Sequence, residues 1–286
     1  MPTYDIFHVK ALHWFIPLYF FFGGLAAGSF LFSFWAGYIN EKLKPLAKTA
    51  AITAPISLAI GLGFLVLDLG QPFRFWRIMM TFQVTSVASW GTWILNLFFA
   101  VSVLYAFLWF NDKSENAKKL GYVGLPLAVF AGMYTGVLLT QLSGNALWDS
   151  ALLPWIFLLG GLLSAMAVAV LIAAITGRKA DVPFYGLKNA LCLLVVLELL
   201  MVVTELVVLY NGDAEAVSVA NLLLAGEFAG WFVGLQIVVG LTLPLILIAS
   251  AKRTPPVGLH AAVSILLLAG ILAVRFIVVM AGQVEL

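Results

Sequence analysis

One apolar stretch runs from Ala11 to Asn40 and reads ALHWFIPLYFFFGGLAAGSFLFSFWAGYIN, without a lysine, arginine, aspartate or glutamate. A transmembrane helix needs about 20 mainly apolar residues, whereas the apolar core of a signal peptide has about 7–15. The stretch is longer than either. We therefore predict that it is an uncleaved first transmembrane helix.

Seven further apolar stretches follow, and charged loops separate most of them. The protein is 63% hydrophobic and 10% charged, against about 45–50% apolar and about 25% charged residues in soluble proteins, so a water-soluble fold is excluded. We predict an all-α integral membrane protein with eight transmembrane helices. The predicted spans are 13–39, 49–68, 88–110, 120–142, 152–176, 189–210, 225–250 and 259–281.

The composition also excludes several functional classes. The net charge of +2 comes from basic residues scattered mostly across loops, which argues against nucleic-acid binding. A single cysteine, Cys192, excludes a disulfide framework, a zinc ribbon and a protein-ligated iron–sulfur cluster. His8 and His13 lie at the opposite end of the spans from His260, so no two face each other across the membrane as a haem pair. A redox protein of this kind would exchange its electrons with another subunit.

Lysines and arginines predict the orientation. Eleven lie in the loops after the first, third, fifth and seventh spans, three lie on the opposite side, and Arg275 lies within a span. Loops rich in these residues stay in the cytoplasm, so both termini are predicted to lie outside, in the periplasm or its equivalent. The eleven are Lys42, Lys44, Lys48, Lys113, Lys118, Lys119, Arg178, Lys179, Lys188, Lys252 and Arg253; the three are Lys10, Arg74 and Arg77.

An internal repeat relates the two halves of the sequence. PLYFFFGGL at Pro17–Leu25 is similar to PWIFLLGGL at Pro154–Leu162, 137 positions later, and the same offset carries Asp68 onto Glu205. Four spans in each half predict a parallel duplication into two four-helix bundles, 1–142 and 143–286. The alternative is that Gly-Gly-Leu recurs by chance, because small residues are common where membrane helices pack.

Ionisable side chains inside a membrane are costly and are functional candidates by default. With a helix rise of about 1.5 Å per residue, the orientation puts nearly all the polar candidates in the outer leaflet and Glu198 near the middle of the membrane. This distribution predicts a polar pocket that opens to the outside. The outer group comprises His13, Tyr19, Asp68, Tyr134, Glu205, Glu227 and Arg275.

Each candidate also has a purely structural interpretation. Arg275 would then be an ion-pair partner of Glu205 or Glu227, and this is compatible with a functional role. His13 would lie among lipid headgroups, and Tyr19 would belong to the interfacial aromatic belt. Glu227 would point into water at the start of its span.

The connection between the second and third spans has a distinctive motif. It reads DLGQPFRFWR at Asp68–Arg77, and TSVASWGTWIL follows at Thr85–Leu95. A glycine and a proline turn the backbone, while Arg74 and Arg77 lie on the outside against the trend of the other basic residues. Basic residues on that side indicate a docked protein partner or an anionic headgroup.

These segments resemble the D-L-G-x-P-x-R-x-W and T-S-x-x-S-W-G motifs of the NrfD/PsrC family. That family comprises quinone-reactive membrane subunits of polysulfide-reductase-type and cytochrome-nitrite-reductase-type complexes. The order and spacing of the motifs match over the whole sequence. The further matches are YFFFGGLAAG at Tyr19–Gly28, YTGVLL at Tyr134–Leu139 with Leu147-Trp148 and Leu153-Pro154, and LAVRFIVVMAGQ at Leu272–Gln283.

The resemblance implies a quinone pocket near the outer face of the inner membrane, with menaquinone or ubiquinone bound exchangeably and no haem or iron–sulfur cluster in this protein. Tyr134 matches a tyrosine that bonds a quinone carbonyl. Tyr19 stands where some members have a histidine with the same role, so His13 or Asp68 could take its place.

The resemblance also implies partner subunits. They are a ferredoxin-like subunit with four iron–sulfur clusters and a periplasmic catalytic subunit, either a molybdopterin enzyme or a multihaem cytochrome. Arg74, Trp76 and Arg77 are the expected docking residues, beside membrane lipid and without any nucleic acid.

Three functions remain open. A quinone-reactive subunit would take up or release its protons on the outer side through Asp68, with Glu205 and Arg275 as a buried pair. A secondary transporter or proton-translocating subunit would use the buried carboxylates, Glu198 among them, although transporter sites usually lie near the midplane. A passive membrane anchor would need neither Glu205 nor Arg275.

Overall fold

The computed structural model describes residues 12–68, 83–142, 145–176, 184–251 and 256–284, and all regular structure within them is helical. In these ranges eight helical segments are long and apolar enough to cross a membrane, which confirms the predicted number of spans. They are α1 (Phe15–Tyr38), α2 (Lys44–Asp68), α4 (Val87–Phe110), α5 (Ser114–Thr140), α6 (Leu153–Ile175), α7 (Phe184–Tyr210), η4 (Gly230–Thr242) continued by α9 (Leu243–Ser250), and α10 (Val257–Ala281).

Some helices extend beyond the predicted spans. The helices α2, α5 and α7 begin at Lys44, Ser114 and Phe184, five or six residues before the expected positions 49, 120 and 189. Apolarity marks only the part of a helix in hydrocarbon, whereas backbone hydrogen bonding continues into the polar interface. The short 3-10 helix η1 (Glu41–Leu43) joins α1 to α2 at this boundary.

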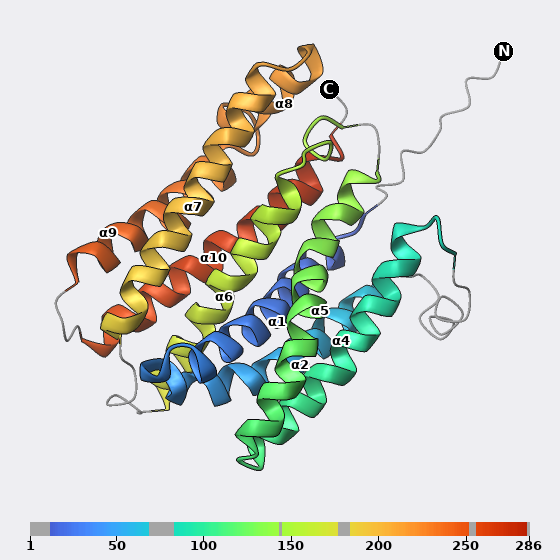
Figure 1. Cartoon of the computed structure of the whole chain (residues 1–286). Coiled ribbons are helices and arrows are strands. Elements are labelled where there is room, and N and C mark those ends of the chain that lie inside the picture. Colours follow the sequence, from blue (N-terminus) through green and yellow to red (C-terminus); the bar gives the residue numbers. More distant parts are fainter. Residues whose placement is uncertain (1–11, 69–82, 143–144, 177–183, 252–255, 285–286) are drawn as a thin grey trace.

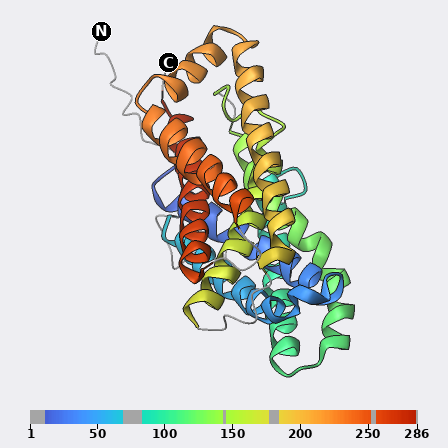
Figure 2. The same ribbon diagram turned by 90° about the vertical axis from the view of Figure 1, so that its left-hand side faces the viewer.

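A short helix between the sixth and seventh spans was not predicted. This helix, α8 (Ala214–Leu224), begins where the side chain of Asp213 accepts a hydrogen bond of 2.9 Å from the backbone N–H of Ala216. Its buried residues pack on the second half of the protein, and Figure 2 shows α8 at the end of the molecule where α7 terminates. The seventh span consequently begins at Gly230 rather than at residue 225.

The helices α1 and α6 form the centre of the molecule, as Figure 1 shows. They approach so closely that a Cβ atom added at Gly28 would overlap the backbone of Gly161. The equivalent glycines of the proposed repeat, Gly24 and Gly161, also face each other. Small residues allow this approach, since membrane helices associate mainly through van der Waals packing.

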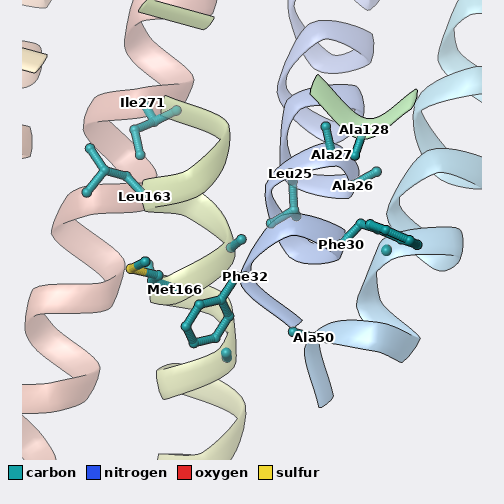
Figure 3. Close-up of a cluster of buried hydrophobic side chains, with 14 of the residues drawn as sticks. Leu25, Ala26, Ala27, Phe30, Phe32, Ala50, Ala128, Leu163, Met166 and Ile271 are labelled. Atoms are coloured by element: carbon teal, nitrogen blue, oxygen red, sulfur yellow. The ribbon is translucent and has the colours of Figure 1, made fainter. Parts of the chain in front are cut away.

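Large and small apolar side chains alternate around this central pair. Figure 3 shows Ala27 of α1 beside Ala128 of α5, and Leu163 of α6 toward Ile271 of α10. On the other side of α1 the rings of Phe30 and Tyr105 lie 4.5 Å apart between centroids. The core thus joins helices from both halves of the protein.

The seventh span is wound as a π-helix over η4 before it continues as α9. The change falls next to Pro244, which has no N–H to donate to the preceding turn. A Cβ at Gly240 of η4 would overlap the backbone of Gly270 in α10, so these two helices are also in close contact. A π-helical segment is uncommon and often occurs at functional sites.

The two ends of the described sequence meet. The side chain of Gln283 accepts a hydrogen bond of 2.9 Å from the backbone N–H of Leu12 and donates one of 3.1 Å to its carbonyl oxygen. We call this the terminal end of the molecule. The opposite end, called here the basic end, is where α1 and α4 finish; its described lysines on the first half are Lys42, Lys44, Lys48, Lys113, Lys118 and Lys119.

Candidate functional site

Two tyrosines lie near the terminal end, inside the first half of the protein. Tyr19 is on α1 and Tyr134 is on α5, four and six residues from the ends of these helices. At about 1.5 Å per residue, both are therefore about 6–9 Å deep. The two side chains are close enough to interact electrostatically.

The ring of Tyr134 lies against bare backbone on α4. A Cβ at Gly91 would overlap Cζ, Cε2 and the hydroxyl oxygen of Tyr134. Gly91 is the glycine of the Ser-Trp-Gly motif, so two segments that are far apart in the sequence form one structural unit. The absence of a side chain at Gly91 is what allows the tyrosine to occupy this position.

The hydroxyl of Tyr19 is buried and available. The side chain is 1% exposed, and among the described residues its hydroxyl has no hydrogen-bond partner. Buried polar atoms in proteins nearly always have a partner, which can be a bound molecule. The prediction of polar groups at this depth therefore coincides with an unpaired donor beside Tyr134.

A carboxylate and a histidine lie closer to the surface. Asp68, the last residue of α2, is 3.2 Å from Nδ1 of His13, with the two side chains 14% and 60% exposed. The structure thus brings these two predicted residues together. His13 is open to its surroundings, as its structural interpretation also requires, while the carboxylate is mostly covered.

An equivalent pair lies in the second half of the protein. Ser150 donates a hydrogen bond of 2.6 Å to Oε2 of Glu205, and both residues are buried. The offset of 137 positions carries His13 onto Ser150 and Asp68 onto Glu205, so both members of one contact map onto both members of the other. Glu205 and Gln236 of η4 also line a small, mostly apolar cavity whose wall includes Leu223 of α8.

The expected pair of Glu205 and Arg275 does not form. Arg275 is 1% exposed; it donates a hydrogen bond of 2.8 Å from Nη2 to the carbonyl oxygen of Phe157, and its guanidinium lies 3.7 Å from the centroid of that ring. The carboxylate beside it is that of Glu198, since a Cβ at Gly160 would lie 3.1 Å from Nη2 of Arg275 and 3.6 Å from Oε1 of Glu198. The pairing prediction was wrong because the side of α10 that carries Arg275 faces α6.

One predicted buried group is at the surface. Glu227 lies in the turn between α8 and η4 and is exposed, so it cannot form a buried ion pair with Arg275. The reason is that α8 and its turn occupy the residues that were expected to start the seventh span. Three predicted docking residues, Arg74, Trp76 and Arg77, lie outside the described residues.

Several residues that hold the motifs together were not found by sequence reasoning. A Cβ at Gly136 would lie 2.6 Å from Cα of Pro154, and one at Gly282 would overlap the indole of Trp148. Trp148 donates a hydrogen bond of 2.8 Å to the carbonyl oxygen of Val278. The signal was present, because each of these glycines lies in a family motif, but the sequence did not indicate which motif each one contacts.

The NrfD family model, described as polysulphide reductase NrfD, matches residues 5–286. The protein belongs to the NrfD family. It is accordingly a multi-pass protein of the inner membrane, consistent with its eight apolar helical segments.

Three relatives show where NrfD-family proteins occur. A selenate reductase subunit of Mesobacillus selenatarsenatis is 29% identical over 94% of this sequence and 73% of its own length. A membrane relative from the polysulfide reductase of Wolinella succinogenes is 26% identical over 95% and 94%. The Hdr-like menaquinol oxidoreductase integral membrane subunit of Archaeoglobus fulgidus is 26% identical over 92% and 69%. These relatives are subunits of redox complexes.

Proposed function

We propose that this protein is the quinone-reactive membrane subunit of a respiratory oxidoreductase complex, and that it exchanges electrons between the membrane quinone pool and an iron–sulfur partner subunit. The observation that carries the proposal is the pair of tyrosines near the terminal end: Tyr134 seated on Gly91, and the buried, unpaired hydroxyl of Tyr19. Membership of the NrfD family and the menaquinol oxidoreductase relative support it.

The two hydroxyls fit the chemistry of a quinone headgroup. Such a headgroup, menaquinone or ubiquinone, has a carbonyl oxygen at each end and accepts two electrons and two protons. Tyr134 donates a hydrogen bond to one carbonyl, and Tyr19 or the His13–Asp68 pair donates to the other. Hydrogen bonds from fixed donors orient the ring and favour the charge that develops on its oxygens.

The proton route in this proposal leads to the outer side. Asp68 ends α2 next to the exposed imidazole of His13, which gives a short path between a covered carboxylate and water. In the inner half of α7, the run from Ala190 to Leu197 contains no carboxylate. Protons therefore enter and leave through His13 and Asp68.

The proposed orientation has both termini in the periplasm and the two halves arranged as parallel four-helix bundles. The concentration of lysines at the basic end supports the orientation. The matching His13–Asp68 and Ser150–Glu205 contacts support the duplication.

The proposed partners bind at the terminal end. A ferredoxin-like subunit with four clusters docks on the connection that contains Arg74, Trp76 and Arg77, and a molybdopterin or multihaem catalytic subunit binds beyond it. The selenate and polysulfide reductase relatives support a complex of this type.

A proton-translocating subunit is the second candidate function, and one observation favours it. Glu198 and Arg275 are both buried at the centre of the molecule, and among the described residues Oε2 of Glu198 and Nε and Nη1 of Arg275 have no hydrogen-bond partner. Charged groups in this position are costly unless they have a function. Their titration would then be coupled to quinone turnover.

The experiment is to purify the protein with its co-purifying partners and to measure bound quinone, iron and quinol oxidation for wild type, Tyr134→Phe and Tyr122→Phe. Tyr122 lies on the same helix but is 60% exposed and nearer its opposite end, so it is a matched control for loss of a hydroxyl. Removing one hydrogen bond costs about 0.5–1.5 kcal/mol. Tyr134→Phe should therefore lower quinone turnover about 2- to 12-fold with unchanged complex yield, and Tyr122→Phe should not. A stable preparation without quinone and iron, or equal kinetics of both variants, would refute the proposal.

A further inference from the structure

A crevice opens at the basic end, far from the tyrosine pair. It lies between the start of α2, the end of α4 and the end of α6, and its volume is about 440 Å³. Ligand sites typically have about 300–1,000 Å³. The main lining residues are Lys48, Thr53, Ile56, Phe110, Ile172 and Thr176.

The wall formed by α2 changes from cationic to apolar along its length. Lys48, Ile52 and Ile56 follow one another at intervals of four residues, so they lie on one face of the helix. The lysine is at the basic end, and the two isoleucines lead toward the middle of the membrane. The side chain of Ile56 is 55% exposed, so the lower part of the crevice opens toward lipid.

Lys48 is held at the rim by weak interactions. Its Nζ donates hydrogen bonds to Oδ1 of Asp112 at 3.2 Å and to the carbonyl oxygen of Phe110 at 3.5 Å. The side chains of Lys48 and Asp112 are 40% and 85% exposed. An exposed ion pair of this kind contributes little, about 0–1 kcal/mol, so a second anion can replace the carboxylate of Asp112 at low cost.

We propose that this crevice binds an anionic phospholipid, with its phosphate at Lys48 and one acyl tail along Ile52, Ile56 and Ile172. The occupant is inferred from the arrangement of a cation at the polar boundary above an apolar channel that opens to lipid. Basic pockets between transmembrane helices bind anionic headgroups in this way, and anionic lipids are abundant in the cytoplasmic leaflet. The proposal does not depend on the quinone site.

The structure predicts opposite effects for two substitutions at the rim. Lys48→Gln removes the cation and should weaken lipid binding. Asp112→Asn removes the competing carboxylate and should strengthen it. Asp112 has a backbone φ of 56°, and asparagine tolerates this left-handed conformation well, so the substitution preserves the turn.

The test is native mass spectrometry of the delipidated full-length protein titrated with phosphatidylglycerol or phosphatidylcholine. Lys119→Gln is the matched control, because Lys119 is an exposed lysine at the same end that does not line the crevice. Lys48→Gln should weaken phosphatidylglycerol binding about fivefold, since one cationic group near an anionic headgroup contributes about 1 kcal/mol and about 1.4 kcal/mol is a factor of ten. Asp112→Asn should strengthen it, and Lys119→Gln should have no effect.

A fourth variant tests the crevice itself without changing charge. Thr176→Trp places a large ring at the rim and should weaken the binding of both lipids, which remains informative if Lys48→Gln fails to fold. Equal losses for Lys48→Gln and Lys119→Gln would mean that only general charge matters and would overturn the proposal. The same holds if Asp112→Asn or Thr176→Trp leaves binding unchanged, or if wild type binds phosphatidylcholine as tightly as phosphatidylglycerol.

Discussion

Gly91→Ala is the substitution that tests the tyrosine site most directly without touching a tyrosine. The added methyl group would overlap Cζ and the hydroxyl of Tyr134, whereas carbon atoms in contact are normally about 3.5–4.0 Å apart. The ring must therefore move, or α4 and α5 must separate. Overpacking of this kind typically costs about 1–3 kcal/mol of stability.

The expected effect on function follows from the displaced hydroxyl. If the hydrogen bond from Tyr134 to the quinone is lost, about 0.5–1.5 kcal/mol of binding is lost with it, which lowers kcat/KM for quinol about 2- to 12-fold. Gly63→Ala is the control, because a Cβ at Gly63 of α2 would have no atom within 4 Å. The assay is quinol oxidation by the purified complex, normalised to its iron content.

A double variant separates a specific effect from general damage. Gly91→Ala should lower kcat/KM much less in a Tyr134→Phe background than in wild type, because residues that act through one contact are not additive. Gly91→Ala with the kinetics of Gly63→Ala would show that Tyr134 is not in the site. Fully additive effects of the two substitutions would show that Gly91 acts through another group.

Two further predictions concern packing and protons. Gly28→Ala should reduce the yield of folded protein in the membrane, because its Cβ would overlap the backbone of Gly161, which cannot rotate away; a normal yield and melting temperature beside Gly63→Ala would contradict the α1–α6 contact. In sealed proteoliposomes, Asp68→Asn should slow turnover and outer-side proton exchange while Glu198→Gln leaves both intact. Loss of cytoplasm-side proton uptake in Glu198→Gln, with Asp68→Asn silent, would reverse the proposed route.

The sequence alone determined which segments are long and apolar enough to cross the membrane, and where along each helix its polar residues lie. Both properties are read along the helix axis: a long apolar run marks a span, and about 1.5 Å per residue converts position into depth. The eight spans were therefore predictable. The short helix α8 was also within reach, since Asp213 is a good N-cap residue before Ala214.

Only the tertiary structure decided which side chains meet across helices. A helix that is apolar on all sides has no hydrophobic stripe to indicate its rotation, so the sequence did not show that Arg275 faces Phe157 and Glu198 rather than Glu205. The rotation of each helix is determined by close backbone contacts, such as that of Gly28 with Gly161. For the same reason, the contact of Gly91 with Tyr134 could be recognised only once α4 and α5 were packed together.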